Sequence, residues 1–389
     1  MLLVKNCDLM NMAGIENEIY DVLMDGGKFV KVAKNIEAPE GCQVIDAAGR
    51  LVTPGLIETH CHLGMASESG SNTNERGNPN LPALRAIDAL EFDALPIRQA
   101  LQTGVTTICT GPGSANIIGG TFAALKTCWQ NPEEQVMVEE LAMKMAFGEN
   151  PKLNYGRKGK TPATRMGCAA TLRDILFKTK AYHEKWLAHQ EKLAKGEAST
   201  FNYDAPMHSL MRVFEGMICK IHCHEAADIL AAIRIAKEFN LNYSIEHTTE
   251  GALIMDELKA EGGKYIVGPT MGGASKAELR FKRYDTQGKL EKAGIRFAIT
   301  TDSGVIPIEH ILTQLCVLVK YGLSKKGALK GVTCDAAWAV GLDDRIGTIE
   351  EGKDADLVIW DVHPLETDGK AGVVVIGGKV RYEADKEEA

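Results

Sequence analysis

The sequence predicts an α/β protein, namely a (β/α)8 barrel of the TIM type flanked by a small β-sandwich domain built from both chain ends. In the middle of the chain, strand-like segments alternate with helix-like segments, the pattern of a parallel sheet. About eight such strands fit into roughly 300 residues, which is the size of a barrel of this type. Both chain ends instead carry short strands separated by turns, too little material for a stable core at either end alone.

The chain is expected to divide into three parts. Residues 1–53 form the first part of the β-sandwich, and residues 350–389 form the second. The two ends are predicted to pair because each alone leaves strand edges exposed. The following side chains are expected in their common core: Val30, Val44 and Ile45. Residues 54–349 form the barrel, which is expected to hold the active site.

The barrel strands are predicted from short apolar runs, taken in chain order. They are expected to end near the following residues: His62, Thr110, Lys126, Phe147, His222, His247, Met271 and Asp302. Active sites of such barrels lie at the C-terminal ends of the strands. Two segments exceed a minimal barrel: a loop rich in Gly, Ser and Asn at residues 65–80, and a polar loop with a charged helix within residues 151–217. Both loops are expected to shape the substrate site.

Composition restricts the class of protein and its partners. The 389 residues are 45% hydrophobic and 25% charged, as is ordinary for a globular enzyme. A net charge of −8 gives no electrostatic reason to expect nucleic acid or a membrane surface as partner. The ten cysteines contain no Cys-x-x-Cys pair, and no apolar run is long enough for a membrane span. We therefore expect a cytoplasmic protein with reduced thiols. Its predicted partners are a small-molecule substrate and further copies of itself in a homo-oligomer.

Two His-x-His motifs are the strongest sign of chemistry. They are His60-Cys61-His62 and His222-Cys223-His224. Each follows a short apolar segment, and alternate residues of a strand face the same side, so both imidazoles of a motif point one way. His247 and Asp302 end two further candidate strands. Imidazoles and a carboxylate gathered at one end of a barrel predict a site for a divalent metal.

A lysine inside an apolar strand adds another candidate. Lys144 in Met143-Lys144-Met145 would be costly to bury as a bare ammonium group. Addition of carbon dioxide would give a carbamate whose two oxygens can bridge two metal ions. An ion pair with a nearby acid is the simpler alternative. Glu149, at the end of the same strand, could bridge the ions without modification.

Several segments resemble the amidohydrolase superfamily. Residues 53–62 resemble its strand-1 signature, and the segment around Lys144 is similar to the carboxylated-lysine strand of its hydantoinase-like members. The segments ending at His222, His247 and Asp302 match the positions of strands 5, 6 and 8. Residues 341–358 resemble the return into the superfamily's β-sandwich. The similarity covers nearly the whole chain and is greatest to imidazolonepropionase-related, metal-dependent amidohydrolases.

This resemblance implies an enzyme that hydrolyses carbon–nitrogen bonds other than peptide bonds, with a dipeptidase as one variant. An amide or cyclic amide would be attacked by a metal-activated hydroxide. Two Zn²⁺ ions per chain are expected, with another divalent metal as the alternative. The implied metal ligands are His60, His62, Lys144, Glu149, His222, His247 and Asp302, where Lys144 and Glu149 are alternative bridges.

The resemblance also implies roles in turnover and binding. Asp302 would act as general base and then general acid, with His247 and His224 beside it. The predicted substrate contacts are Arg157, Arg165 and Glu225.

Two alternatives stay open. His222 and Glu225 form a His-x-x-Glu pattern, which in mononuclear deaminases of the superfamily places a glutamate as proton shuttle to an aminated heterocycle. A single metal on His60, His62, His222 and Asp302 would then suffice, and Lys144 would have no task. The second alternative is a non-catalytic, metal-bound scaffold. The full ligand set favours a catalyst over a scaffold.

Overall fold

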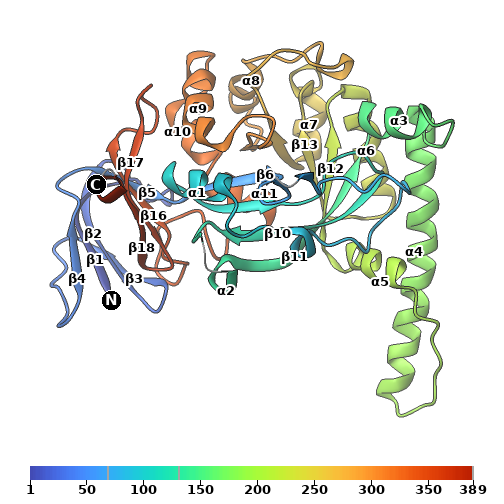
Figure 1. The fold of residues 1–389 in the computed structure, drawn as a ribbon, viewed down its shortest axis with the longest axis horizontal. Helices are drawn as coiled ribbons and strands as arrows, with labels where there is room; N and C mark the ends of the chain where they lie inside the picture. The colour runs from blue at the N-terminus through green and yellow to red at the C-terminus, as the bar shows by residue number, and fades with distance from the viewer. Residues whose placement is uncertain (68–69, 130–131, 388–389) are drawn as a thin grey trace.

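The computed structural model describes residues 1–67, 70–129 and 132–387 (Figure 1). A nearly closed barrel sheet lies in the middle, a second sheet made from both chain ends lies beside it, and a long helical arm projects from the far side of the barrel. Residues 68 and 69 of the loop predicted at 65–80 lie outside the described residues. Among the helices that the structure describes, none is both long and apolar enough to cross a bilayer.

The second sheet, here called the end sheet, joins strands from the two ends of the chain. Its strands are β1 (Leu2–Leu9), β2 (Glu18–Asp25), β3 (Lys28–Ala33), β4 (Gln43–Asp46), β5 (Leu51–Pro54), β16 (Leu357–Val362), β17 (Lys370–Ile376) and β18 (Lys379–Glu383). One edge of β1 is shared by β4 and β5, and β5 pairs in turn with β16. The predicted pairing of the two ends is therefore confirmed, in the form of one hydrogen-bonded sheet.

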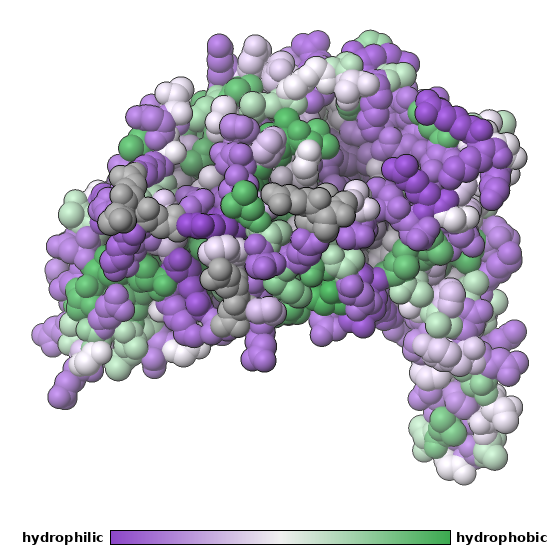
Figure 2. Space-filling model, viewed as in Figure 1, coloured by the Kyte–Doolittle hydropathy of each residue, from purple (hydrophilic) through white to green (hydrophobic). Residues whose placement is uncertain are grey.

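The end sheet encloses a core to which both ends contribute. It includes Leu9, Val22, Met24, Leu357 and Ile359, all fully buried. Apart from Ile45, which packs against this core, the side chains predicted for it lie elsewhere: Val30 is 43% and Val44 47% exposed. Figure 2 shows apolar side chains gathered on the surface at this end of the molecule. Val30 and Val44 were wrongly predicted because strands with one exposed face carry some apolar residues outward.

The barrel sheet contains the predicted eight strands. They are β6 (Leu56–Cys61), β9 (Val105–Thr110), β10 (Ile118–Lys126), β11 (Val136–Ala146), β12 (Ile218–Cys223), β13 (Tyr243–His247), β14 (Lys264–Val267) and β15 (Ala298–Ile299). Their spatial order is β15-β14-β13-β12-β11-β10-β9-β6. The strand expected to end near Met271 ends four residues earlier, at Val267.

The sheet departs from the predicted parallel barrel at β10, which runs antiparallel to both of its neighbours. Only residues 111–117 connect β9 to β10, and a parallel crossover needs a dozen or more residues. The short connection therefore forces the chain to turn back. Lys126, at the end of β10, consequently lies away from the other strand ends and forms ion pairs with Asp354 and Asp356.

A side chain ties the two edge strands of the barrel together. Glu58 of β6 is fully buried, and its carboxylate accepts hydrogen bonds from Thr300 Oγ1 at 2.5 Å, Thr301 N at 2.8 Å and Thr301 Oγ1 at 2.6 Å. Burial raises the pKa of Glu58 despite these donors. Residues 300 and 301 follow β15, so this contact holds the ends of β6 and β15 side by side where the site is built.

Helices cover the barrel and extend it into an arm. The α-helices are α1 (Leu95–Gln102), α2 (Pro132–Gln135), α3 (Glu149–Gly156), α4 (Arg165–Ala194), α5 (Ala205–Met211), α6 (Ala226–Glu238), α7 (Met255–Glu261), α8 (Thr286–Lys292), α9 (Ile311–Lys320), α10 (Lys325–Lys330), α11 (Cys334–Val340) and α12 (Ala384–Glu387). Short 3-10 helices are η1 (Ala86–Ala89), η2 (Arg212–Glu215), η3 (Gly251–Leu253), η4 (Ala277–Leu279) and η5 (Ile308–His310), and β7 (Ala66–Ser67) pairs with β8 (Gly70–Ser71).

The arm begins with α4, the charged helix that the sequence predicts after the polar loop. Thr164 caps its N-terminus by accepting a hydrogen bond from Gly167 N at 3.0 Å. At 1.5 Å per residue, its 30 residues span about 45 Å, and Figure 1 shows its far half extending beyond the barrel.

Candidate metal centre

The C-terminal ends of β6, β12, β13 and β15 bring two groups of metal-type ligands together. The open group consists of His60, His62 and Asp302, and the closed group consists of His222, His224 and His247. Within each group, one ligand atom per residue lies within 4.8 Å of the others. Five of the predicted metal ligands thus meet as the sequence implied. His224, predicted only as a catalytic residue, joins them.

Backbone carbonyls orient two of these histidines. His62 Nδ1 lies 2.7 Å from the carbonyl oxygen of Gly111, and His247 Nδ1 lies 2.8 Å from that of Gly268. A carbonyl only accepts hydrogen bonds, so each Nδ1 carries the proton and each Nε2 keeps a free lone pair. This is the arrangement in which imidazoles bind metals.

A buried carboxylate orients His60 in the same way. Glu246 Oε2 accepts from His60 Nδ1 at 2.7 Å and lies 3.0 Å from Lys220 Nζ. All three side chains are fully buried. Carboxylate partners of this kind fix the tautomer of a ligand histidine and increase its basicity.

In the open group, two acceptors face each other. Asp302 Oδ1 lies 3.3 Å from His62 Nε2 and 3.9 Å from His60 Nε2. With the proton of His62 on Nδ1, a carboxylate oxygen and a nitrogen lone pair meet without a hydrogen between them, an arrangement that a cation stabilises. The surrounding histidines and Lys144 hold the pKa of Asp302 below its usual range although burial opposes this. Asp302 is therefore anionic at neutral pH, and its side chain is 13% exposed.

Lys144 reaches the centre from β11. Its Nζ lies 3.0 Å from His60 Nε2, and the side chain is 1% exposed. Burial lowers the pKa of Lys144 to about 8. Burial likewise lowers the pKa of His60, His222 and His247, so these imidazoles are neutral, as metal ligands must be.

Unusual backbone conformations occur at two of the strand ends. His247 has φ 71° and Asp302 has φ 51°, both in the left-handed region that side chains rarely adopt. Such conformations cost about 1–3 kcal/mol each and gather at functional sites. At His247 the turn also breaks strand alternation, so that Glu246 and His247, although consecutive, both face the barrel interior.

A further carboxylate lies against the closed group. Glu278, from η4 in the loop between β14 and α8, is 2% exposed, and its Oε1 lies 3.7 Å from His222 Nε2 and 3.6 Å from His224 Nε2. Glu149 faces this loop instead of the metal ligands: its N donates to Glu278 Oε2 at 2.7 Å and its Oε2 accepts from Glu278 N at 3.2 Å. The structure thus brings Lys144, and not Glu149, to the ligand groups.

The predicted substrate contacts lie at the edge of the site and not at its centre. Glu225 occupies the N-cap position of α6 without a capping side-chain hydrogen bond, and it forms ion pairs with Arg165 and Arg280. Arg165 also lies 3.2 Å from Asp228, which is 1% exposed. Arg157 lies apart, at the rim of an open cavity of about 460 Å³.

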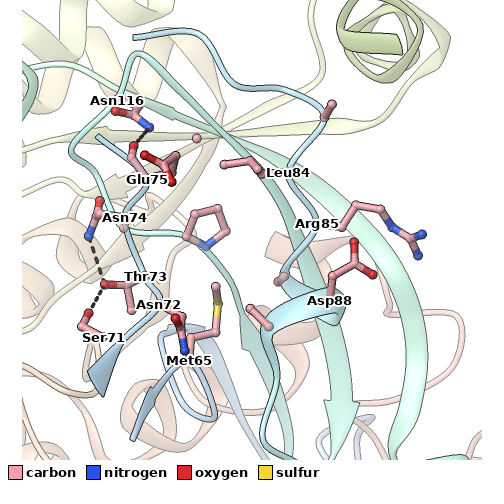
Figure 3. A pocket seen from close by; sticks show the side chains of 16 residues that line it. Met65, Ser71, Asn72, Thr73, Asn74, Glu75, Leu84, Arg85, Asp88 and Asn116 are labelled. Carbon is pink, nitrogen blue, oxygen red and sulfur yellow. Dashed lines mark hydrogen bonds between the residues drawn. The ribbon is translucent and has the colours of Figure 1, made fainter. Parts of the chain in front are cut away.

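A second cavity, of about 360 Å³, is lined by residues that follow the open group's His62 in the chain (Figure 3). Met65, three residues after His62, lines one side, and the loop predicted to set the substrate supplies Asn72, Thr73 and Asn74. Its polar wall is held by internal hydrogen bonds, such as that from Asn116 Nδ2 to the carbonyl oxygen of Glu75 at 2.6 Å. This volume suits a small molecule.

Sequence reasoning missed four charged residues at the centre. Two of them had a signal: Glu58 and Lys220 each stand two positions before a ligand histidine and therefore share its strand face. No sequence signal indicated Glu246, because strand alternation turns its side chain away from that of His247 unless the backbone is left-handed. Glu278 had none either, because it comes from a loop.

Comparison with known proteins identifies relatives along the whole chain. Residues 51–381 match the model of the Amidohydrolase family. An imidazolonepropionase from Mesorhizobium japonicum is 28% identical over 348 residues, covering 84% of this chain and 81% of that protein. An amidohydrolase named tasK from Hapsidospora irregularis is 27% identical over 93% of this chain, which spans only 40% of that longer protein. The crystal structure of an amidohydrolase from Thermotoga maritima superposes with a TM-score of 0.93 at 36% identity, covering 98% of this chain and 100% of that one.

Proposed function

This chain belongs to the amidohydrolase family of carbon–nitrogen bond hydrolases, and we propose that it cleaves an amide or cyclic amide with two divalent ions, zinc by default. One observation carries the proposal: the Nδ1 atoms of His60, His62 and His247 are each held by an acceptor, which leaves the lone pair of each imidazole on Nε2 at the same strand ends. Buried acceptors that face one another without protons are suited to cations.

We propose that His60, His62 and Asp302 hold one ion and that His222 and His247 hold the other. Divalent ions in such sites lower the pKa of a water molecule to about 7 and polarise a carbonyl oxygen. Asp302 has the anionic charge to take a proton from the nucleophile and pass it to the leaving amine. Its partial exposure lets it reach a bound substrate.

Lys144 is proposed to bridge the ions as a carbamate. The neutral amine attacks the carbon of carbon dioxide and releases one proton to solvent, which gives a carbamate whose single negative charge is shared by two oxygens. The position of Nζ, 3.0 Å from His60 Nε2, supports this assignment. The mass of the intact protein, compared before and after acid treatment that releases carbon dioxide, tests it, with Lys144→Met as control.

Substrate contacts are proposed at the charged edge of the site. Arg165 and Arg280 both pair with Glu225, so one guanidinium group can turn to a substrate carboxylate while the other keeps the pair. Arg157 is proposed as a contact for the distal part of a longer substrate. N-acyl amino acids or dipeptides would use these contacts, and a dipeptidase is one form of the activity.

The geometry favours hydrolysis over deamination. A deaminase needs the carboxylate of Glu225 to reach a substrate ring, and here that carboxylate is held by two arginines. A screen of cyclic amides, N-acyl amino acids, dipeptides and aminated heterocycles, run with metal analysis, tests the proposal. Turnover of amides with close to two ions per chain supports it. Turnover of aminated heterocycles alone, with a single ion, contradicts it.

We also propose a homo-oligomer in the cytoplasm. All ten cysteines are free thiols, as reducing conditions require. Large apolar side chains are exposed on α4, with Phe177 57%, Leu187 51% and Leu193 47% exposed. Figure 2 shows apolar side chains on the surface of the arm. Light scattering of the wild type and of a Phe177→Ser, Leu187→Ser variant tests whether the arm contacts a second copy.

A further inference from the structure

Glu278 brings a carboxylate to the closed group that the proposed reaction does not use. Its Oε2 accepts a hydrogen bond from Glu149 N, which fixes the orientation of the carboxylate, and Oε1 points to the imidazoles of His222 and His224. Glu278 Oε1 and His222 Nε2 are both buried. The ammonium group of Lys276 lies beside Glu278 Oε1, whereas His222 Nε2 makes no hydrogen bond among the described residues. A carboxylate oxygen and an imidazole nitrogen therefore face each other here as well.

His224 is held like a metal ligand. Its Nδ1 lies 2.7 Å from Thr249 Oγ1, which leaves Nε2 directed to His222, His247 and Glu278. The ring stacks on that of His247 with 4.6 Å between the centroids. A histidine that contacted only substrate would not need this orientation toward two other imidazoles.

The spacing fits a tetrahedral ion. With metal–nitrogen bonds of 2.0–2.1 Å, neighbouring ligand atoms of a tetrahedral zinc site lie about 3.3 Å apart. The distances of 3.6 and 3.7 Å from Glu278 Oε1 to the two nitrogens exceed this by a few tenths of an ångström. Small side-chain movements would therefore complete the coordination.

We propose that His222, His224, His247 and Glu278 form a closed site for a divalent transition metal of the zinc type, to which the proposed carbamate of Lys144 would add a fifth ligand. The inference rests on the second ion of the proposed function and assigns it two more ligands, His224 and Glu278. Sites filled by four protein ligands serve structure and charge, whereas catalytic sites keep an open position. The ion on His60, His62 and Asp302 would then be the one that meets the substrate.

The same geometry leads to a separate prediction about Lys276 and zinc affinity. Its Nζ lies 2.5 Å from Glu278 Oε1 and 3.2 Å from Asn150 Oδ1, and its side chain is 25% exposed. An ammonium group and a metal ion compete for the same oxygen, so Lys276→Met should bind zinc more tightly than the wild type. If the ion pair were merely structural, Lys276→Met would instead lower the stability of the protein and leave its zinc affinity unchanged.

Metal content provides the main test, with no need for activity. Wild type, Glu278→Gln and Glu250→Gln are equilibrated with buffered zinc, and bound ions are counted per chain. Glu250 is a matched control: it is 6% exposed, its Oε2 accepts from Ala226 N at 2.8 Å, and it faces the helix α6 N-terminus. We expect Glu278→Gln to lose one of two ions, or to bind it at least about tenfold more weakly, and Glu250→Gln to keep both.

Cobalt substitution gives a second readout, because the visible spectrum of Co²⁺ depends on its ligands. Glu278→Gln and His224→Gln should change the same component of this spectrum. If Glu278→Gln is insoluble, His224→Gln takes its place in the test. Wild-type affinity and an unchanged spectrum in the soluble variants overturn the inference, as does unchanged or weaker zinc binding by Lys276→Met. A wild type that binds fewer than two ions refutes the binuclear function itself, so the two failures are distinguishable.

Discussion

The two His-x-His motifs share a sequence pattern and a place at a strand end, yet their surroundings differ. His60 and His62 meet Asp302, and the side chains of His62 and Asp302 are 18% and 13% exposed. His222 and His224 meet Glu278, and their side chains are only 4% and 5% exposed. One group is therefore partly open to solvent, and the other is covered by a loop. The same local motif acquires its role from the segment that supplies its carboxylate.

The groups also differ in what holds their histidines. A charged carboxylate, Glu246, holds His60, whereas a neutral hydroxyl, Thr249, holds His224. Hydrogen bonds to charged groups are roughly twice as strong as those between neutral groups. The comparison therefore predicts unequal effects from equivalent substitutions.

The largest effect is expected when the support of both groups is removed. Deletion of residues 366–389 removes all of β17 and β18, and uncovers Leu357 and Ile359 of β16. Because β5 of the end sheet leads through Gly55 directly into β6, the open group should lose its support first. We expect aggregation in a solubility assay. A soluble truncated protein with an unchanged melting temperature would show that the chain ends do not depend on each other.

Asp302→Asn should cause the next largest loss. Removal of a general acid and base costs about 10²–10⁴-fold in rate, and Asp302 belongs to the open group. Glu225→Gln should cost less than tenfold, because its carboxylate is proposed to bind and not to transfer protons. The measurement is kcat/KM on the amide found in the screen. Equal and near-complete loss in both variants would instead indicate proton transfer through Glu225.

Glu246→Gln should weaken metal binding at the open group by about 10–100-fold. The amide is nearly the same size, but it lacks the charge that holds His60 Nδ1. Zinc affinity measured by competition with a chelator checks this, and the melting temperature of the metal-loaded protein controls for misfolding. Affinity equal to that of the wild type would mean that Glu246 only balances the charge of Lys220.

Thr249→Val should have the smallest effect. A neutral hydrogen bond contributes about 0.5–1.5 kcal/mol, so the closed group should bind its ion about two- to tenfold more weakly. Valine keeps the shape of threonine, and the same chelator competition applies. A loss larger than that of Glu246→Gln would reverse the ranking of the two groups.

Most of the central architecture was predictable because it follows from local patterns. Apolar runs placed the eight barrel strands, and alternation placed the histidines of each motif on one face. The reversal of β10 was predictable as well, since residues 111–117 are too few for a parallel crossover. The prediction of an all-parallel barrel was wrong because the number of strands does not fix their directions, which depend on the lengths of the connections between them.

The sequence by itself determined which residues the strand ends present: two His-x-His pairs, His247, Asp302 and a buried lysine. It could do so because the period of a strand is a local property. Only the tertiary structure decided what joins them. The left-handed backbone at His247 turns Glu246 toward His60, and a loop far along the chain brings Glu278 to His222 and His224. These contacts depend on packing between distant segments, which no local pattern of residues encodes.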